Sequence, residues 1–145
     1  NEITWLDWHA GDALLRDFVA QVFALRRELR ALRSARWHDG VADLAWYAPD
    51  GQPMTPADWE QPGAAPLQAR FGGAPAVLLL VNPTSHDAAM VLPACASGAG
   101  AHTTTDSAWI VRLRSDDIAT PTQPTPLARR VTLPPHCLWV AVARA

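Results

Sequence analysis

The stretch Ala74-Pro75-Ala76-Val77-Leu78-Leu79-Leu80-Val81-Asn82 decides the fold class of this chain. The segment Val77–Val81 is apolar throughout, which is typical of a central strand covered on both faces. The whole apolar run, from Ala74 to Val81, is far too short to cross a membrane as a helix. A central strand needs partners on both sides, so the sequence around it should supply further strands.

Short apolar runs broken by Gly and Pro supply these partners on both sides of the central strand. About seven short strands separated by turn residues are typical of an antiparallel sandwich, so we predict a mainly β fold. The candidate strands are Asp43–Tyr47, Leu67–Phe71, Ala76–Asn82, Ala88–Leu92, Trp109–Arg114, Arg130–Leu133 and Leu138–Ala143.

Two of these strands show a side-chain alternation that predicts which residues face the core. In Trp109–Arg114, the residues Trp109, Val111 and Leu113 alternate with Ile110, Arg112 and Arg114, which predicts a half-buried strand. In the last strand, Leu138, Val140 and Val142 share one face, which leaves Trp139 on the other.

The segments between the strands carry clear turn signals. Ala94–Ser107 and the Thr/Pro-rich Ala119–Pro126 are predicted to be loops or excursions, and the second cannot form a central strand. Pro49-Asp50-Gly51 predicts a tight turn. After it, Thr55 suits a helix N-cap and Pro56 the first helical position, so we predict one helical turn that delivers Trp59 against the sandwich.

One long helix, Asp12–Leu32, precedes the strands. Asp12 is a suitable N-cap, and several Arg residues crowd the C-terminal half, where positive charge favours the helix dipole. An apolar stripe at steps of three and four must pack on something large. The stripe contains Leu15, Phe18, Val22, Leu25, Leu29 and Leu32, and Leu14, Val19 and Phe23 widen it.

Composition excludes several classes of function. At 145 residues, with 49% apolar and 18% charged residues, the chain suits a single globular domain with at most an appended piece. The net charge of −2 gives no basic footprint for nucleic acid or an acidic membrane surface. The five His residues show no ligand spacing, so we expect neither a metal nor a cofactor. Cys95 and Cys137 do not reveal whether they pair, and reduced thiols in a cytoplasmic protein are the simpler interpretation.

The first residues, Asn1-Glu2-Ile3-Thr4-Trp5-Leu6-Asp7-Trp8, place two Trp and two carboxylates ahead of the helix. A Trp side chain is rarely left without something to bury it, so we expect this start to be a cut inside a larger folded protein. From the residues alone, Glu2 and Asp7 are weak candidates for catalysis, because any two acids near a chain end would pass the same test.

Four blocks of sequence, taken in order, resemble the C-terminal end of bacterial glycogen debranching enzymes, isoamylase-type members of the alpha-amylase superfamily of glycoside hydrolases. The first block is Asn1–Trp8, and the second is the helix ending Leu25-Arg26-Arg27 with Ala31-Leu32 and Arg36-Trp37 after it. The third block is Trp46 followed by Pro49-Asp50-Gly51, Met54-Thr55 and Asp58-Trp59. The fourth block is Leu78-Leu79-Leu80-Val81-Asn82.

The resemblance implies a division of the chain into two parts. Residues 1–36 would be a loop and the last helix of a truncated (β/α)8 catalytic barrel, and residues 37–145 would be the C-terminal β-sandwich. The family hydrolyses α-1,6 branch linkages of glycogen and limit dextrins, with a carboxylate nucleophile and a carboxylic acid as proton donor. Both would lie on earlier barrel strands, so the resemblance implies no catalytic residue in this chain.

Three residues are candidates for contact with substrate: Trp5, Asp7 and Trp139. Under the resemblance, Asp7 is better interpreted as organising its loop than as catalytic. Trp5 and Trp8 fit packing better than stacking on sugar rings, and of the two Trp5 is the candidate neighbour of substrate. Trp46, Trp59, Trp109 and Trp139 could form a glycan platform, although core packing suits most of them better.

Three hypotheses about function therefore stand side by side. The chain is an inert accessory domain of a debranching enzyme, an α-glucan-binding module that acts through exposed Trp, or an unrelated β-sandwich interaction domain. In the first case its partners would be the missing barrel and, through the parent protein, α-glucan. Without the barrel, the helix stripe would dock on the sandwich, dimerise or cause association.

Overall fold

The computed structural model describes residues 11–33, 44–94, 109–120 and 122–144. These residues form a six-stranded sheet with strand order β1-β2-β3-β8-β5-β6 and a two-stranded sheet of β4 and β7, and every strand pair is antiparallel. The strands are β1 (Leu44–Tyr47), β2 (Leu67–Phe71), β3 (Val77–Asn82), β4 (Ala88–Val91), β5 (Trp109–Arg114), β6 (Thr125–Pro126), β7 (Arg130–Leu133) and β8 (Cys137–Ala143).

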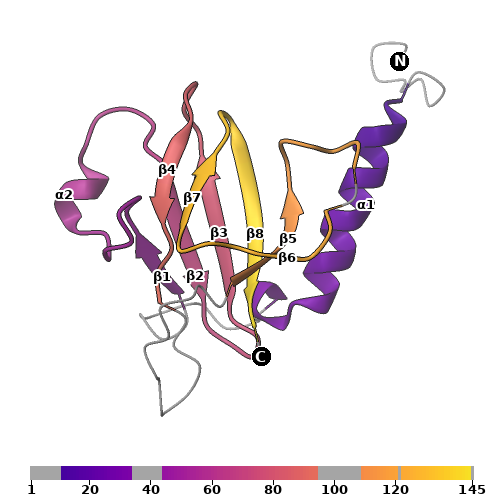
Figure 1. Ribbon diagram of the computed structural model, residues 1–145, viewed down its shortest axis with the longest axis horizontal. Helices are drawn as coiled ribbons and strands as arrows, with labels where there is room; N and C mark the ends of the chain where they lie inside the picture. The colour runs from indigo at the N-terminus through magenta and orange to yellow at the C-terminus, as the bar shows by residue number, and fades with distance from the viewer. Residues whose placement is uncertain (1–10, 34–43, 95–108, 121, 145) are drawn as a thin grey trace, which may run out of the picture.

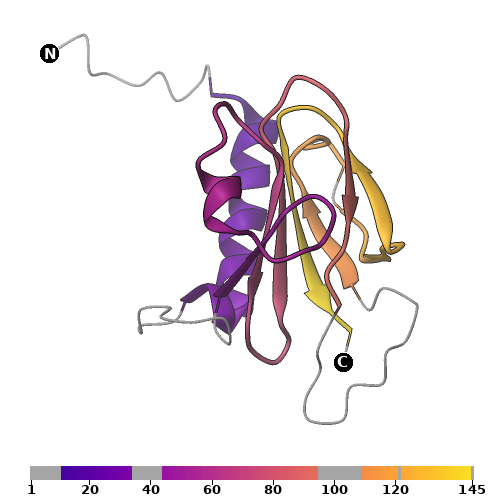
Figure 2. The same cartoon turned by 90° about the vertical axis from the view of Figure 1, so that its left-hand side faces the viewer.

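The molecule has three layers, with the large sheet in the middle (Figures 1 and 2). The pair β4–β7 covers one face, and the helix α1 (Ala13–Glu28) covers part of the other. The prediction of a mainly β antiparallel sandwich preceded by one long helix is confirmed. The apolar run at residues 77–81 is confirmed as a central strand, since β3 lies between β2 and β8.

The core divides into two clusters because side chains alternate across the large sheet. The cluster between the two sheets contains Leu78, Leu80, Met90, Trp109 and Leu133 among its buried members. The cluster under α1 joins Leu25 and Leu29 to Val77, Val140 and Val142. Most of the helix stripe has therefore docked on the sheet, one of the three outcomes expected for it, whereas Leu15 stays exposed.

The helix begins as predicted but ends earlier. The Asp12 carboxylate accepts hydrogen bonds from the backbone N–H of Leu14 (2.8 Å) and of Leu15 (3.2 Å), which confirms the N-cap. The prediction that the helix runs to Leu32 is wrong: the chain turns extended at Leu29, and a short 3-10 turn, η2 (Arg30–Arg33), follows. Leu29 is buried in the cluster under α1, so tertiary packing ends the helix where propensity alone would extend it.

The turn after β1 is confirmed in detail. The Gly51 N–H donates to the Ala48 carbonyl (3.0 Å), and Gly51 has a φ of 82°. One helical turn follows, α2 (Pro56–Trp59), in which the Asp58 carboxylate accepts from the Thr55 N–H and hydroxyl, each at 2.7 Å. Because the Met54 N–H donates to the Trp46 carbonyl (2.9 Å), the segment leading into α2 is fastened to β1.

The half-buried alternation predicted for β5 is confirmed, because buried and half-buried residues alternate along it, but a bulge changes the face of its last residues. The register with β8 shifts between Val111 and Leu113. Trp109 and Val111 therefore face β4–β7, whereas Leu113 packs in the cluster under α1. A bulge inserts one extra residue and reverses the side chains that follow it. Trp109, Val111 and Leu113 are thus all buried, but Leu113 lies on the opposite face of the large sheet.

Two polar side chains lie fully inside this core, and both fasten loops. Gln68 Nε2 donates to the carbonyls of Ala48 and Val91, each at 2.9 Å, and so joins β2 to the turn after β1 and to β4. Asn82 Nδ2 contacts the carbonyls of His86 and Pro134 at 2.8 Å. The amide nitrogens of both side chains thus donate to backbone carbonyls and fix the connections around them.

Candidate functional site

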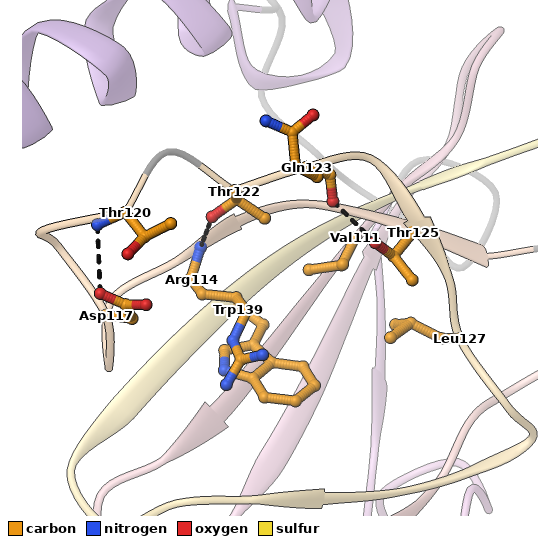
Figure 3. A pocket seen from close by; sticks show the side chains of 9 residues that line it. All are labelled: Val111, Arg114, Asp117, Thr120, Thr122, Gln123, Thr125, Leu127 and Trp139. Atoms are coloured by element: carbon orange, nitrogen blue, oxygen red, sulfur yellow. Dashed lines mark hydrogen bonds between the residues drawn. The ribbon is translucent and has the colours of Figure 1, made fainter.

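A pocket of about 270 Å³ opens beside Trp139, where β5 and β8 meet the loop between β5 and β6 (Figure 3). Its lining combines one indole, one guanidinium, one carboxylate, three hydroxyls and one amide with aliphatic side chains. The lining residues are Val111, Arg114, Asp117, Thr120, Thr122, Gln123, Thr125, Leu127 and Trp139. This set can hydrogen-bond a neutral polar ligand.

Trp139 is held on two sides within this site. Its indole N–H donates to Asp116 Oδ1 at 2.6 Å, and the Arg114 guanidinium carbon lies 4.4 Å from the centroid of its ring. Arg114 also binds Asp116, with Nε 3.3 Å from Oδ1 and Nη2 2.5 Å from Oδ2. A cation above an indole and a carboxylate at its N–H stabilise one orientation of the ring.

The charges of this network perturb each other. Burial alone would raise the pKa of Asp116, but the hydrogen bonds from Arg114 and from Trp139 outweigh it, so the pKa is lowered overall. The hydrogen bond to Asp116 raises the pKa of Arg114, which keeps the guanidinium charged. Trp139, Arg114 and Asp116 therefore form an ion-paired unit that persists at neutral pH.

The bulge in β5 is what brings Arg114 to Trp139. Arg114 and Trp139 are register partners across β5 and β8, and the shift after Val111 turns Arg114 toward the β4–β7 side of the sheet. Arg114 and Asp116 were not predicted as partners of Trp139, because strict alternation does not reveal a bulge. The available signal was an Arg and an Asp two residues apart at the end of a predicted strand.

The loop that closes the pocket is shaped by its own polar groups. Thr122 Oγ1 accepts from the Arg114 N–H (3.1 Å), and Asp117 Oδ1 accepts from the Thr120 N–H (3.2 Å). The Thr125 hydroxyl donates to the Gln123 carbonyl (2.9 Å). The segment predicted as a loose excursion thus ends in β6, a two-residue strand at the edge of the sheet, the position at which a sheet tolerates Pro126.

Of the three residues predicted to contact substrate, Trp139 lies in the described part of the chain. Trp139 faces away from Leu138, Val140 and Val142, as predicted, but its exposed fraction is only 7%. Trp5 and Asp7 lie outside the described residues. Contact of any of the three with substrate stays a prediction.

Among the described residues, the exposed Trp side chains lie elsewhere, on the edge strand β1 and on α2. Trp46 is 39% exposed and Trp59 is 53% exposed, and their ring centroids are 5.4 Å apart with an interplanar angle of 82°. Trp109 is fully buried, and its indole N–H donates to the Pro93 carbonyl at 2.9 Å. The four Trp considered as a glycan platform therefore divide into two core residues and one exposed pair.

Within the ranges that the structure describes, no cluster of His, Cys, Asp or Glu could hold a metal ion. In the same ranges, none of the helices has the length and apolar character needed to cross a membrane. Cys137 is a free, buried thiol whose pKa burial raises to about 11. Cys95 lies outside the described residues, so its state stays open.

Fold and site together define a β-sandwich domain with one N-terminal helix on its large sheet. No family model matches the chain. It is similar to the glycogen debranching enzyme of Pectobacterium atrosepticum, with 43% identity over 94 residues, and to those of Klebsiella pneumoniae (38%) and Yersinia pseudotuberculosis (35%). Each match covers 64% of this chain and 14% of the relative's length. The resemblance seen in the sequence is thereby confirmed.

Proposed function

We propose that this chain is an accessory domain of a glycogen debranching enzyme, without hydrolytic activity of its own. The observation that carries the proposal is an apolar strip on α1 that the sheet does not cover. Leu15, Val19 and Phe23 follow one another at a spacing of four residues and are 52%, 41% and 58% exposed. Leu14, 49% exposed, adds to the apolar surface of the same helix.

An exposed apolar strip on a helix supports an interface with another folded unit. Isolated surface hydrophobics are common, but a row of them on one helix marks a contact surface. Most of the length of each relative lies outside the match, because the match covers 14% of it. We propose that the strip packs against the catalytic part of the parent enzyme, with residues 1–36 as the last loop and helix of its barrel and residues 37–145 as the accessory sandwich.

The reaction itself would be carried out elsewhere in the parent protein. On this proposal the parent hydrolyses α-1,6 branch linkages of glycogen in the cytoplasm, and its nucleophile and proton donor lie outside this chain. Trp5 and Asp7 would stand near the substrate at the barrel rim. Trp139, which contacts Arg114 and Asp116, would stabilise the sandwich and line the pocket.

A comparison of two proteins tests the proposal. The product of the complete gene that encodes this chain and the 145-residue chain itself are each incubated with glycogen limit dextrin, and new reducing ends are measured. We expect release of reducing ends by the gene product and none by the chain. Turnover by the chain alone, or an inactive gene product, contradicts the proposal.

A further inference from the structure

We propose that the Trp46–Trp59 pair, which we call the aromatic pair, is a binding site for a segment of α-glucan chain. The inference deepens the proposed function and rests on it for the identity of the ligand. It starts from the place of the pair in the fold. Trp46 pairs in register with Ala69, and Ala69 pairs with Leu79, which packs in the cluster under α1. Trp46 therefore points to the α1 side of the sheet.

The helix does not cover the aromatic pair. The described members of the cluster under α1 come from α1, η2, β2, β3, β5 and β8, and none lies on β1. Figure 1 shows α1 and α2 at opposite ends of the large sheet. Among the described residues, no member of that cluster covers the β1 end of this face, in agreement with the exposed fractions of both Trp side chains.

Hydrogen bonds fasten the backbone segments that carry the two rings. The Asp58 capping interactions fix α2, and the Met54–Trp46 hydrogen bond fastens the segment that leads into it. A segment whose backbone is already fixed loses little conformational entropy when a ligand binds to it. The edge-to-face arrangement puts the two ring planes nearly at right angles, so a chain that bends between sugar units can contact both.

The charge of this region selects the class of ligand. Residues 44–63 contain three carboxylates, Asp50, Asp58 and Glu60, and no basic residue. Polyanions such as nucleic acids are repelled by such a surface. Exposed polar side chains of Gln52, Glu60 and Gln61 can hydrogen-bond hydroxyl groups. Aromatic rings whose neighbours in sequence carry neutral and acidic hydrogen-bonding groups fit an uncharged polyhydroxylated chain, and glycogen is the one that the names of the relatives supply.

Affinity electrophoresis of the 145-residue chain in native gels that contain glycogen tests the site. We expect retardation of the wild type and about tenfold weaker apparent affinity for Trp46→Ala and for Trp59→Ala. Phe23→Ala is the matched control, because it removes an exposed aromatic ring from α1 and should leave the retardation unchanged. An unretarded wild type, or equal retardation of all four proteins, overturns the proposal.

A second measurement needs no variant and so does not depend on the fold of one. N-bromosuccinimide oxidises exposed Trp, and peptide mapping reports the extent at Trp46 and Trp59. We expect maltoheptaose to slow oxidation at both and the β-linked cellohexaose to leave it unchanged. Equal rates with and without maltoheptaose contradict the site. An inactive complete gene product would refute the proposed function, whereas failure in these two assays refutes the aromatic pair alone.

Discussion

Replacement of Gly51 by Ala should destabilise the chain more than the same change at Gly63. Both glycines have positive φ, 82° and 96°, where an L side chain costs about 1–2 kcal/mol. At Gly63 an added Cβ meets nothing within 4 Å, whereas at Gly51 it would lie 2.7 Å from the Val91 carbonyl oxygen. That oxygen also accepts from Gln68 Nε2, so moving it disturbs a buried hydrogen bond.

The magnitudes follow from these two environments. We expect Gly63→Ala to lower the free energy of unfolding by about 1–2 kcal/mol. Gly51→Ala adds the cost of forcing an atom into a packed site, about 1–3 kcal/mol, for a total of about 2–5 kcal/mol. Urea denaturation followed by far-ultraviolet circular dichroism measures both values. Equal losses for the two variants would refute the claim that the turn is packed against β4.

Three further predictions concern the core and its charges. Leu25→Ala should lower the free energy of unfolding of the isolated chain, measured by urea titration, by about 2–5 kcal/mol because Leu25 is buried under α1. Phe23→Ala should change the same free energy by less than about 0.5 kcal/mol, because Phe23 is exposed. Similar losses for the two variants would contradict the observed orientation of the helix. Asp116→Asn should lower the free energy of unfolding by about 1 kcal/mol at pH 7, a small value because solvent partly screens the exposed Arg114 side chain. Because folding lowers the pKa of Asp116, the stabilisation that its carboxylate gives is complete above the ordinary pKa of 3.8 and is lost as the pH falls through the pKa of the folded state. The free energies of unfolding of wild type and variant should therefore converge in strong acid. A difference between them that persists in strong acid refutes the ion pair. Cys137, with its pKa raised to about 11, should resist iodoacetamide at pH 8 until urea unfolds the chain. Mass-spectrometric mapping of the peptide that contains Cys137 measures the labelling. Rapid labelling of the native chain would contradict the burial of Cys137.

The fold was largely predictable because its signals are local. The all-apolar run of β3, the Pro49-Asp50-Gly51 turn and the Asp12 cap each rest on residues close in sequence. The end of α1 was not predictable, since Leu29 is drawn into a cluster whose other members come from distant strands. The bulge in β5 leaves no trace in an alternating pattern, and it alone decides that Arg114 meets Trp139.

The candidate site was predicted less well, for a related reason. Alternation in β8 correctly assigned Trp139 to the face opposite Val140, but whether a ring on that face is exposed depends on what lies above it. Arg114 and Asp116 contact Trp139, whereas Trp46 is not among the described members of the cluster under α1. Exposure of a Trp is a tertiary property, and the sequence reports only its direction from the sheet.

The most direct test of docking through α1 is to measure the effect of Phe23→Asp by thermal unfolding in two proteins. These are the isolated 145-residue chain and the product of the complete gene. Phe23 is 58% exposed in the chain, so the substitution should change the stability of the isolated chain by no more than about 0.5 kcal/mol. If the strip on α1 packs against the catalytic part, the same substitution buries an unpaired charge in the complete protein and lowers its melting temperature by several degrees. Equally small effects in the two settings would contradict the claim that this domain docks through α1.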